Sequence, residues 1–175
     1  LNTISAMRQL GVNITIDENN VHIKGLGLLG LTKPKNTINV GNSGTLIRLL
    51  AGVLATQNFT SSLTGDSSLR SRPMARILKP LKSCGADITS DSFRAPLKIN
   101  PQKEFSCIKY NQEIASAQVK SCLILAALFI KGEHVFYEKI PTRDHTENLL
   151  QHFNYDMQRT DNKLVISGQQ KLIAK

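Results

Sequence analysis

One short pattern occurs three times along the chain at nearly equal spacing. A helix-like segment reaches Gly11, Gly85 or Asn154, and alternating apolar residues follow each of these positions. Gly85 follows Gly11 by 74 residues, and Asn154 follows Gly85 by 69. Glycine and asparagine enter the left-handed backbone conformation most readily, and many helices end in that conformation. A structural unit is therefore predicted to recur about every 70 residues.

The earlier part of this unit is repeated as well. Residues 43–55 and 116–129 are apolar nearly all round, so both are predicted to form buried central helices. Strand candidates precede and follow these helices, at residues 38–40, 61–64, 107–110 and 135–137. With the second helix and a closing hairpin, the predicted unit is βαβαββ, which is an α/β fold.

Each unit is expected to close with a β-hairpin. In the first hairpin, Ile14 and Ile16 pair with Val21 and Ile23 across the turn at residues 17–20. Residues 97–99 and 164–166 supply the corresponding second strands of the later hairpins. The chain is thus divided into the end of a first unit (1–31), a second unit (32–101) and a third unit (102–175), packed as a single lobe.

A basic segment follows the strand candidate at 61–64. Five basic residues lie between positions 70 and 82, and no acid lies between Ser67 and Ala86. Apolar residues at helical spacing follow Pro73, at Met74, Ile77, Leu78 and Leu81. This pattern predicts a helix with Pro73 in its first turn and with free N–H groups aimed at Arg70 and Arg72. The segment is then either an anion site or a solvated basic helix face.

The charge balance narrows the possible partners. The chain has 22 Lys and Arg residues against 13 Asp and Glu, giving a formal net charge of +9. This balance suits nucleic acid, a membrane surface or small polyanionic substrates. Aromatic residues are only 5% with no Trp, which disfavours base stacking, and the longest apolar run, 122–130, is too short to span a bilayer. Charge alone does not choose among these three kinds of partner, and the scarcity of aromatic residues disfavours nucleic acid without excluding it.

The cysteine and histidine residues do not form a metal or disulfide pattern. Cys84, Cys107 and Cys122 are odd in number and share no Cys-x-x-Cys spacing, which favours a reducing, cytoplasmic compartment. His145 and His152 have the spacing of one helix face but lack further ligands. No metal and no cofactor are expected.

Four motifs resemble those of one enzyme family. Residues 64–74 resemble the Thr-Gly-Asp-x-Ser-Leu-Arg-x-Arg-Pro-Met signature of the 5-enolpyruvylshikimate-3-phosphate synthase family. Residues 41–49 are similar to its Gly-Asn-Ser/Ala-Gly-Thr-x-x-Arg motif, and the segments at 116–121 and 142–147 follow in family order. The resemblance covers essentially the whole chain but only the middle of a family member. We therefore expect a truncated chain that lacks a second lobe and an N-terminal Lys-Ser segment.

This resemblance implies a fold and a reaction. The fold is one lobe of an enolpyruvyl-transferase-like alpha-beta prism, built from three units around a helical core. The reaction transfers the enolpyruvyl group of phosphoenolpyruvate to the 5-hydroxyl group of shikimate 3-phosphate, with release of phosphate. It belongs to the shikimate pathway of chorismate and aromatic amino-acid biosynthesis. The chain alone is expected to be inactive. Its implied partners are small anionic substrates and the second lobe of the same polypeptide, with neither nucleic acid nor membrane.

The resemblance also implies the substrate-binding residues. Those for phosphoenolpyruvate are Asn42, Gly44, Thr45, Arg72 and Gln118, and Gly44 is where the competing herbicide glyphosate needs room. Those for shikimate 3-phosphate are Ser116, Ala117, Gln118 and Arg143. No residue of the chain is assigned as a catalytic acid or base.

Several of these residues also have ordinary structural interpretations. Ser43 or Asn42 is expected to cap the helix at 43–55, and Ser116 to cap the later helix. Arg143 would then form a surface salt bridge with Asp144 or Glu147. A lone arginine in the first apolar helix, Arg48, is predicted to be buried against a carboxylate rather than to bind a ligand.

Two other functions remain open from the sequence. A UDP-N-acetylglucosamine enolpyruvyl transferase would share the repeated units, although its characteristic cysteine loop is not evident around Cys84, Cys107 or Cys122. An RNA 3′-terminal phosphate cyclase or a simple RNA-binding module would use related units with a basic surface. Steep salt dependence of RNA binding would distinguish that class.

Overall fold

The computed structural model describes residues 1–173. Its helices are α1 (Asn2–Gln9), α2 (Gly44–Ala55), α3 (Ser67–Ser71), α4 (Ala75–Ser83), α5 (Ala117–Ala127) and α6 (His145–His152). Its strands are β1 (Asn13–Asp17), β2 (Asn20–Lys24), β3 (Ile38–Asn39), β4 (Ser61–Thr64), β5 (Asp87–Asp91), β6 (Arg94–Asn100), β7 (Lys109–Asn111), β8 (Glu133–Tyr137), β9 (Met157–Arg159) and β10 (Lys163–Ser167). The mixed α/β content predicted from the sequence is confirmed, and the predicted strands lie within a few residues of the observed ones.

The two four-stranded sheets have the same plan. Their strand orders are β3-β4-β6-β5 and β7-β8-β10-β9. In each sheet the first pair is parallel and the other two pairs are antiparallel. A helix connects the parallel strands in both cases, α2 in the first sheet and α5 in the second. The same strand order, with the same parallel and antiparallel pairs, therefore occurs twice in the chain.

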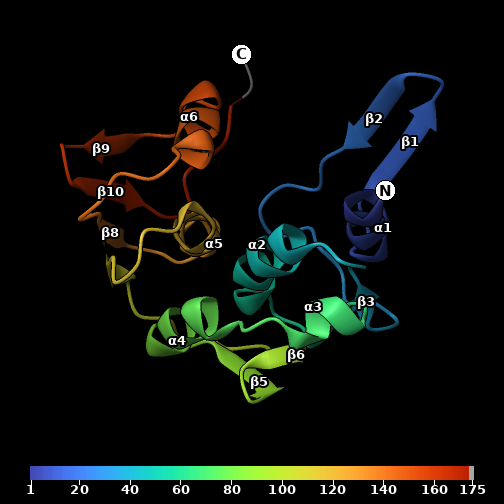
Figure 1. Cartoon of the computed structure of the whole chain (residues 1–175). Helices are drawn as coiled ribbons and strands as arrows, with labels where there is room; N and C mark the ends of the chain where they lie inside the picture. Colours follow the sequence, from blue (N-terminus) through green and yellow to red (C-terminus); the bar gives the residue numbers. More distant parts are fainter. Residues whose placement is uncertain (174–175) are drawn as a thin grey trace.

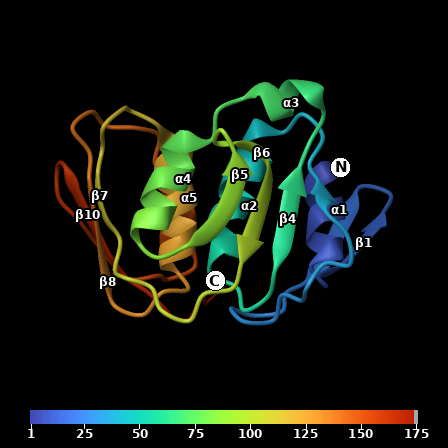
Figure 2. The same cartoon turned by 90° about the horizontal axis from the view of Figure 1, so that it is seen from below.

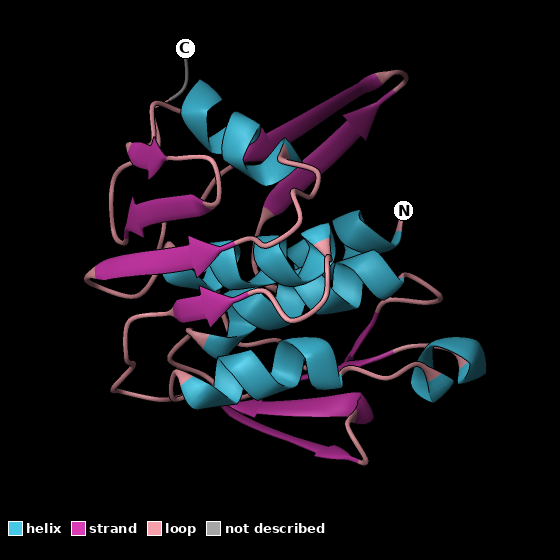
Figure 3. Ribbon diagram, turned by 60° about the vertical axis from the view of Figure 1, so that its left-hand side comes forward, coloured by secondary structure: helices cyan, strands magenta, loops and turns pink. Residues whose placement is uncertain are grey.

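The two four-stranded sheets lie on the outside, with helices α2, α4 and α5 between them (Figures 1 and 2). Figure 1 shows α2, α4 and α5 in the middle, with strands β5 and β6 below them and β8, β9 and β10 at the left. From below, β4, β6 and β5 lie in front of α2 (Figure 2). The hairpin of β1 and β2 projects from the rest of the molecule, as Figures 1 and 3 show.

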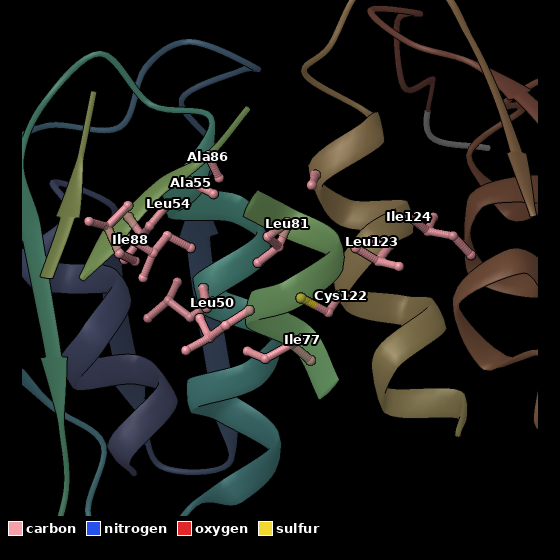
Figure 4. Packing of buried hydrophobic residues seen from close by; sticks show 14 of the residues in the cluster. Leu50, Leu54, Ala55, Ile77, Leu81, Ala86, Ile88, Cys122, Leu123 and Ile124 are labelled. Atoms are coloured by element: carbon pink, nitrogen blue, oxygen red, sulfur yellow. The ribbon is translucent and has the colours of Figure 1, made fainter. Parts of the chain in front are cut away.

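Helices α2 and α5 form the centre of the core because apolar residues surround both of them. A Cβ atom on Gly52 of α2 would overlap the main-chain carbonyl oxygen of Cys122 in α5, so the two helix backbones touch there. Leu50 and Leu54 of α2 pack near Leu81 of α4 in the same cluster (Figure 4). The prediction that 43–55 and 116–129 are buried central helices is confirmed.

The three predicted helix-to-hairpin junctions have one hydrogen-bond pattern. Gly11, Gly85 and Asn154 all have positive φ, at 91°, 111° and 53°. Each donates its N–H group to the carbonyl oxygen three residues earlier, and the next residue donates to the carbonyl five residues before itself. This pair of bonds is the Schellman motif. A hairpin follows every junction, with Ile14 opposite Ile23 and Ile16 opposite Val21 in the first. The sequence interpretation of all three junctions is confirmed.

The basic segment folds differently from its prediction. The helix expected to start around Pro73 begins at Ala75, and a separate short helix, α3, precedes it. Arg72 ends α3 in an extended conformation, with φ −76° and ψ 137°. A residue before proline avoids the helical region because the proline ring clashes with it, so Arg72 interrupts the helix. Arg70 and Arg72 therefore belong to the end of α3, and α4 starts two residues later than Pro73.

The Schellman junctions generate a stability prediction. Gly85→Ala should lower the free energy of unfolding by roughly 2 kcal/mol, because the left-handed conformation costs an alanine about 1–2 kcal/mol. The added Cβ would also lie 2.9 Å from the carbonyl oxygen of Glu104. Gly25→Ala is the matched control, since Gly25 does not have a positive φ and its Cβ would meet nothing within 4 Å. Urea denaturation of both variants should show the larger loss for Gly85, and equal losses would contradict this account.

Candidate anion-binding site

The loop between β3 and α2 supplies the first part of the site. Ser43 caps α2, since its Oγ accepts a hydrogen bond from the N–H of Leu46 at 3.2 Å. Asn42 is therefore free for other contacts. Its amide nitrogen donates to Asp66 Oδ2 at 2.9 Å, and its Oδ1 accepts from the Arg72 guanidinium. The choice between the two predicted caps is settled in favour of Ser43.

Asp66 anchors the segment that delivers Arg72. Its Oδ1 caps α3 by accepting the N–H of Leu69 at 2.8 Å, while its other oxygen holds Asn42. These bonds, led by the Leu69 N–H, keep the pKa of Asp66 below its ordinary value, and the Arg72 charge acts in the same direction. Asn42 and Asp66 therefore fix Arg72 beside the N-terminus of α2.

Arg48 joins α2 to α5 at the same end of the two helices. Its Nη1 donates to Gln118 Oε1 at 2.9 Å, and the Gln118 amide nitrogen donates to Thr45 Oγ1, also at 2.9 Å. The prediction that Arg48 is buried against a carboxylate is wrong, because within residues 1–173 it forms no ion pair. Its partners are neutral oxygens, since the start of α5 presents an amide where a carboxylate was expected.

Two guanidinium groups converge on Gly44. A Cβ atom there would lie 3.0 Å from Arg72 Nη1 and 3.2 Å from Arg48 Nη1. Burial, and then the charges of Arg72 and Arg76, lower the pKa of Arg48 from its ordinary value. Neither α2 nor α5 has an acidic residue in its first turn, so the positive ends of both helices add to this field. Uncompensated cations and helix N-termini are the elements of an anion site.

The N-terminus of α5 contributes three of the predicted residues. Ser116 caps the helix, accepting the N–H of Val119 at 3.4 Å, as its ordinary interpretation predicted. Ala117 is the first helical residue and offers only its backbone, while Gln118 is the residue that reaches Arg48 and Thr45. The structure therefore links all five residues predicted for phosphoenolpyruvate through direct contacts or through Arg48.

Arg143 lies outside this hydrogen-bonded cluster. It is exposed just before α6, and within the described part of the chain it forms no ion pair. The predicted alternative of a bridge to Asp144 or Glu147 is wrong. Asp144 pairs with Arg159 at 3.1 Å, and Glu147 pairs with Lys120 at 2.6 Å. Both acids are thus engaged elsewhere, and Arg143 keeps its charge available.

Sequence reasoning missed two cations in the central helices. Arg48 was assigned to the wrong kind of partner, and Lys120, which is 1% exposed in α5, was given no role. The available signal was a single cation within an otherwise apolar helix. Such residues are almost never fully buried unless they are paired, so each one demands a partner or a ligand.

One cleft of the molecule lies away from this cluster. It has a volume of about 550 Å³ and lies between α4 and residues 109–114, with Arg76, Lys79 and Lys109 among its lining residues. None of the residues predicted to bind substrate lines it. Asn42 and Thr45 are exposed, and Arg72 and Gln118 are half-buried, so the candidate site is an open, positively charged wall rather than a closed cavity.

Other possible sites are not supported by the described residues. Between residues 1 and 173, no three His, Cys, Asp or Glu side chains gather to hold a metal ion. All three cysteines are free, and burial raises the pKa of the Cys122 thiol to about 12. In this same part of the chain, no helix combines the length and the apolar character needed to cross a membrane.

Comparison with known proteins gives one consistent match. The family described as EPSP synthase (3-phosphoshikimate 1-carboxyvinyltransferase) matches residues 1–175. The chain is 47% identical over 174 residues to the 3-phosphoshikimate 1-carboxyvinyltransferase of Ruthia magnifica subsp. Calyptogena magnifica and 47% identical over 173 residues to that of Coxiella burnetii. Its structure resembles the EPSP synthase of Acinetobacter baumannii with a TM-score of 0.93 and 44% identity. These matches cover 98–99% of this chain but only 40% of each relative.

The convergence on Gly44 predicts a selective effect of one methyl group. Gly44→Ala should change the free energy of unfolding by less than about 1 kcal/mol, because the new Cβ meets only the ends of two flexible arginine side chains. It should weaken phosphate binding several-fold, since the methyl group occupies the space between those cations. Thermal melting and a phosphate titration would measure both, with Gly25→Ala as control because its Cβ would meet nothing within 4 Å. Unchanged phosphate affinity would place the anion elsewhere.

Proposed function

The chain belongs to the EPSP synthase family, and from this membership we propose that it forms one part of a 3-phosphoshikimate 1-carboxyvinyltransferase. The enzyme transfers the enolpyruvyl group of phosphoenolpyruvate to the 5-hydroxyl group of shikimate 3-phosphate. That oxygen loses its proton and bonds to the carbon bearing the phosphate, while the methylene carbon gains a proton. The C=C bond is thereby broken and a tetrahedral intermediate forms. Loss of phosphate and of one proton from the new methyl group re-forms the double bond and yields 5-enolpyruvylshikimate 3-phosphate.

The observation that carries this proposal is the convergence of Arg48 and Arg72 at Gly44. Phosphoenolpyruvate bears a carboxylate and a phosphate, and the planar fork of a guanidinium meets either group with two parallel hydrogen bonds. Thr45 and Gln118 offer further polar contacts beside the same helix N-terminus. We assign phosphoenolpyruvate to this position, with Asn42 holding Arg72 in place.

Shikimate 3-phosphate is assigned to the N-terminus of α5. Ser116 offers a hydroxyl group, Ala117 a backbone N–H and Gln118 an amide. Arg143 is the cation proposed for the same phosphate group, and it is supported by the engagement of Asp144 and Glu147 with other partners. Gln118 would then contact both substrates, because it already connects α5 to α2.

The role of these residues is to bind and orient charge. They gather two polyanions and offset the negative charge that develops during the reaction, as preorganised donors do in many enzymes. No catalytic acid or base is assigned within this chain. Proton transfer and exclusion of water are therefore proposed to require the remainder of the polypeptide, which closes over the wall described here.

The free edge of β2 supports the proposal of an incomplete lobe. Strands β6 and β10, the second strands of the later hairpins, each pair on both edges, whereas among residues 1–173 the β1–β2 hairpin pairs with no further strand. Ile16, Val21 and Ile23 of this hairpin are 47–63% exposed, although one face of a hairpin is normally covered. The chain spans about 40% of the length of the curated relatives it matches. We propose two nearly complete βαβαββ units, 32–101 and 102–175, with the first unit completed by another part of the protein.

The alternative functions are not proposed. The matching family and its relatives at 47% identity favour shikimate 3-phosphate over a UDP-sugar or RNA as substrate. The proposal places the enzyme in the cytoplasm, and the free state of Cys84, Cys107 and Cys122 supports a reducing compartment.

In the complete enzyme, Arg72→Ala should lower kcat/KM by the equivalent of about 3 kcal/mol or more, the scale for a preorganised charged contact in a closed site. Arg76→Ala is the matched control, because Arg76 is exposed and acts on the cluster only through its charge. Its effect should stay below about 1 kcal/mol, as expected for a screened surface charge. Steady-state kinetics of both variants measures the difference. If both lost activity equally, the basic segment would act only as a diffuse positive field.

The 175-residue chain alone should bind shikimate 3-phosphate weakly and show no turnover, because it supplies one wall and no acid or base. Mixing it with the remainder of a family member should restore phosphate release, since closure assembles the charges that the transition state requires. A continuous phosphate assay with and without the added segments tests this. Steady turnover by the chain alone, with host enzyme excluded, would overturn the half-site proposal.

A further inference from the structure

Lys120 connects three segments of the chain through buried charges. Its Nζ atom lies 3.0 Å from Glu138 Oε2 and 2.6 Å from Glu147 Oε1. Lys120 is in α5, Glu147 is in the first turn of α6, and Glu138 directly follows β8. The side chains of Lys120 and Glu147 are each 2% exposed, and that of Glu138 is 13% exposed. We refer to these three residues as the Lys120 triad.

The triad holds the loop of residues 138–144, which carries Arg143. While one oxygen of Glu138 meets Lys120, the other accepts the N–H of Thr142 at 3.2 Å and its hydroxyl at 2.6 Å. Gln112, which is buried, bonds both backbone groups of Ile140 from the other side, at 2.9 and 2.8 Å. Arg143 follows Thr142 directly, so its backbone is fixed relative to α5.

The Lys120 triad is not expected to add much to the free energy of unfolding. One lysine and two glutamates have a formal charge of −1, and Glu147 Oε2 is buried with no hydrogen-bond partner among residues 1–173. A buried, unpaired acceptor costs stability, and a buried ion pair is often no better than apolar packing of the same volume. Buried charge pairs of this kind can instead hold the segments they join in one particular arrangement.

We propose that Lys120 and Glu138 are positioning residues for the shikimate 3-phosphate end of the site. They hold the 138–144 loop at one place against α5, so that Arg143 meets the same phosphate group as Ser116 and Gln118. Lys120 lies about one helical turn beyond Ser116, so the tether is anchored next to the helix N-terminus that the phosphate approaches. Neither residue touches the substrate. This inference rests on the proposed function.

Glu138→Ala is the variant that cuts this tether. It leaves the buried Lys120 ammonium paired with Glu147, so the ion pair in the core survives and the chain should fold. Removing a carboxylate makes the chain more positive and by itself would tighten phosphate binding. We expect the opposite: affinity of the 175-residue chain for shikimate 3-phosphate should fall about tenfold or more, because a hydrogen bond to a charged group is worth that much when it is lost.

Nuclear magnetic resonance spectra can separate positioning from general damage. In Glu138→Ala, the Thr142 amide should exchange its hydrogen about tenfold faster or more, since a hydrogen-bonded amide is protected in proportion to the stability of its local structure. On titration with shikimate 3-phosphate, the signals of Ser116 and Gln118 should still respond, whereas the Arg143 side-chain signal should not. Arg159→Gln is the control, because it breaks the exposed 3.1 Å pair with Asp144 in the same loop without touching the triad. It should change affinity by less than about twofold, as surface pairs contribute little.

Each result supports or overturns the inference. Equal or tighter binding by Glu138→Ala, or an unchanged Thr142 exchange rate, would overturn it. If shikimate 3-phosphate moved no signal of α5 even in the unaltered chain, the proposed function would fail, and with it the role of the loop in binding. If Glu138→Ala did not fold, Thr142→Val would replace it, because this variant removes the 2.6 Å hydroxyl bond at nearly constant volume. Full retention of affinity by Thr142→Val would then overturn the proposal.

Discussion

The close contact between α2 and α5 is the constraint on which the site depends. Gly52 has no side chain, so the backbone of α2 can lie against the carbonyl group of Cys122 in α5. Two helices in such contact, both entered from the parallel edge of a sheet, present their N-termini close together. The bond between Arg48 and Gln118 is the direct result of this packing. A close contact between two helix backbones deep in the core thus sets the spacing of polar groups at the surface.

Each of the two central helices carries one cationic side chain, and the partners of these two cations differ. Arg48 has neutral partners, and burial together with Arg72 and Arg76 lowers its pKa. Lys120 has two carboxylates within 3.0 Å. An uncompensated buried charge is costly until an anion arrives, whereas a compensated one costs little further and fixes its partners. The first arrangement suits binding, and the second suits holding a loop in place.

The sequence predicted the parts of the fold that depend on local backbone chemistry. Gly11, Gly85 and Asn154 end helices in the left-handed conformation because few other residues do so cheaply, and the order of residues is enough to show it. The helix before Pro73 was missed because Asp66 stabilises α3 through a cap that competes with the apolar periodicity further along. The partners of Arg48 and Lys120 were beyond reach, since they come from segments 70 and 18 residues away whose contact depends on tertiary packing.

The same distinction explains why the proposed binding residues could be assigned from the sequence while the groups that support them could not. Asn42, Gly44 and Thr45 stand together in one motif that resembles the family's, so the resemblance alone was enough to propose them. The groups that hold Arg72 and the 138–144 loop form no such motif, since a carboxylate from any nearby segment satisfies the same requirement. Asp66 serves both as the cap of α3 and as the partner of Asn42, and Glu138 uses its two oxygens for Lys120 and Thr142. Asp66 supports Arg72 through Asn42, and Glu138 supports the loop that carries Arg143. Among residues 1–173 neither acid forms an ion pair with the arginine it supports, so the positive charge of the wall remains available for an anion.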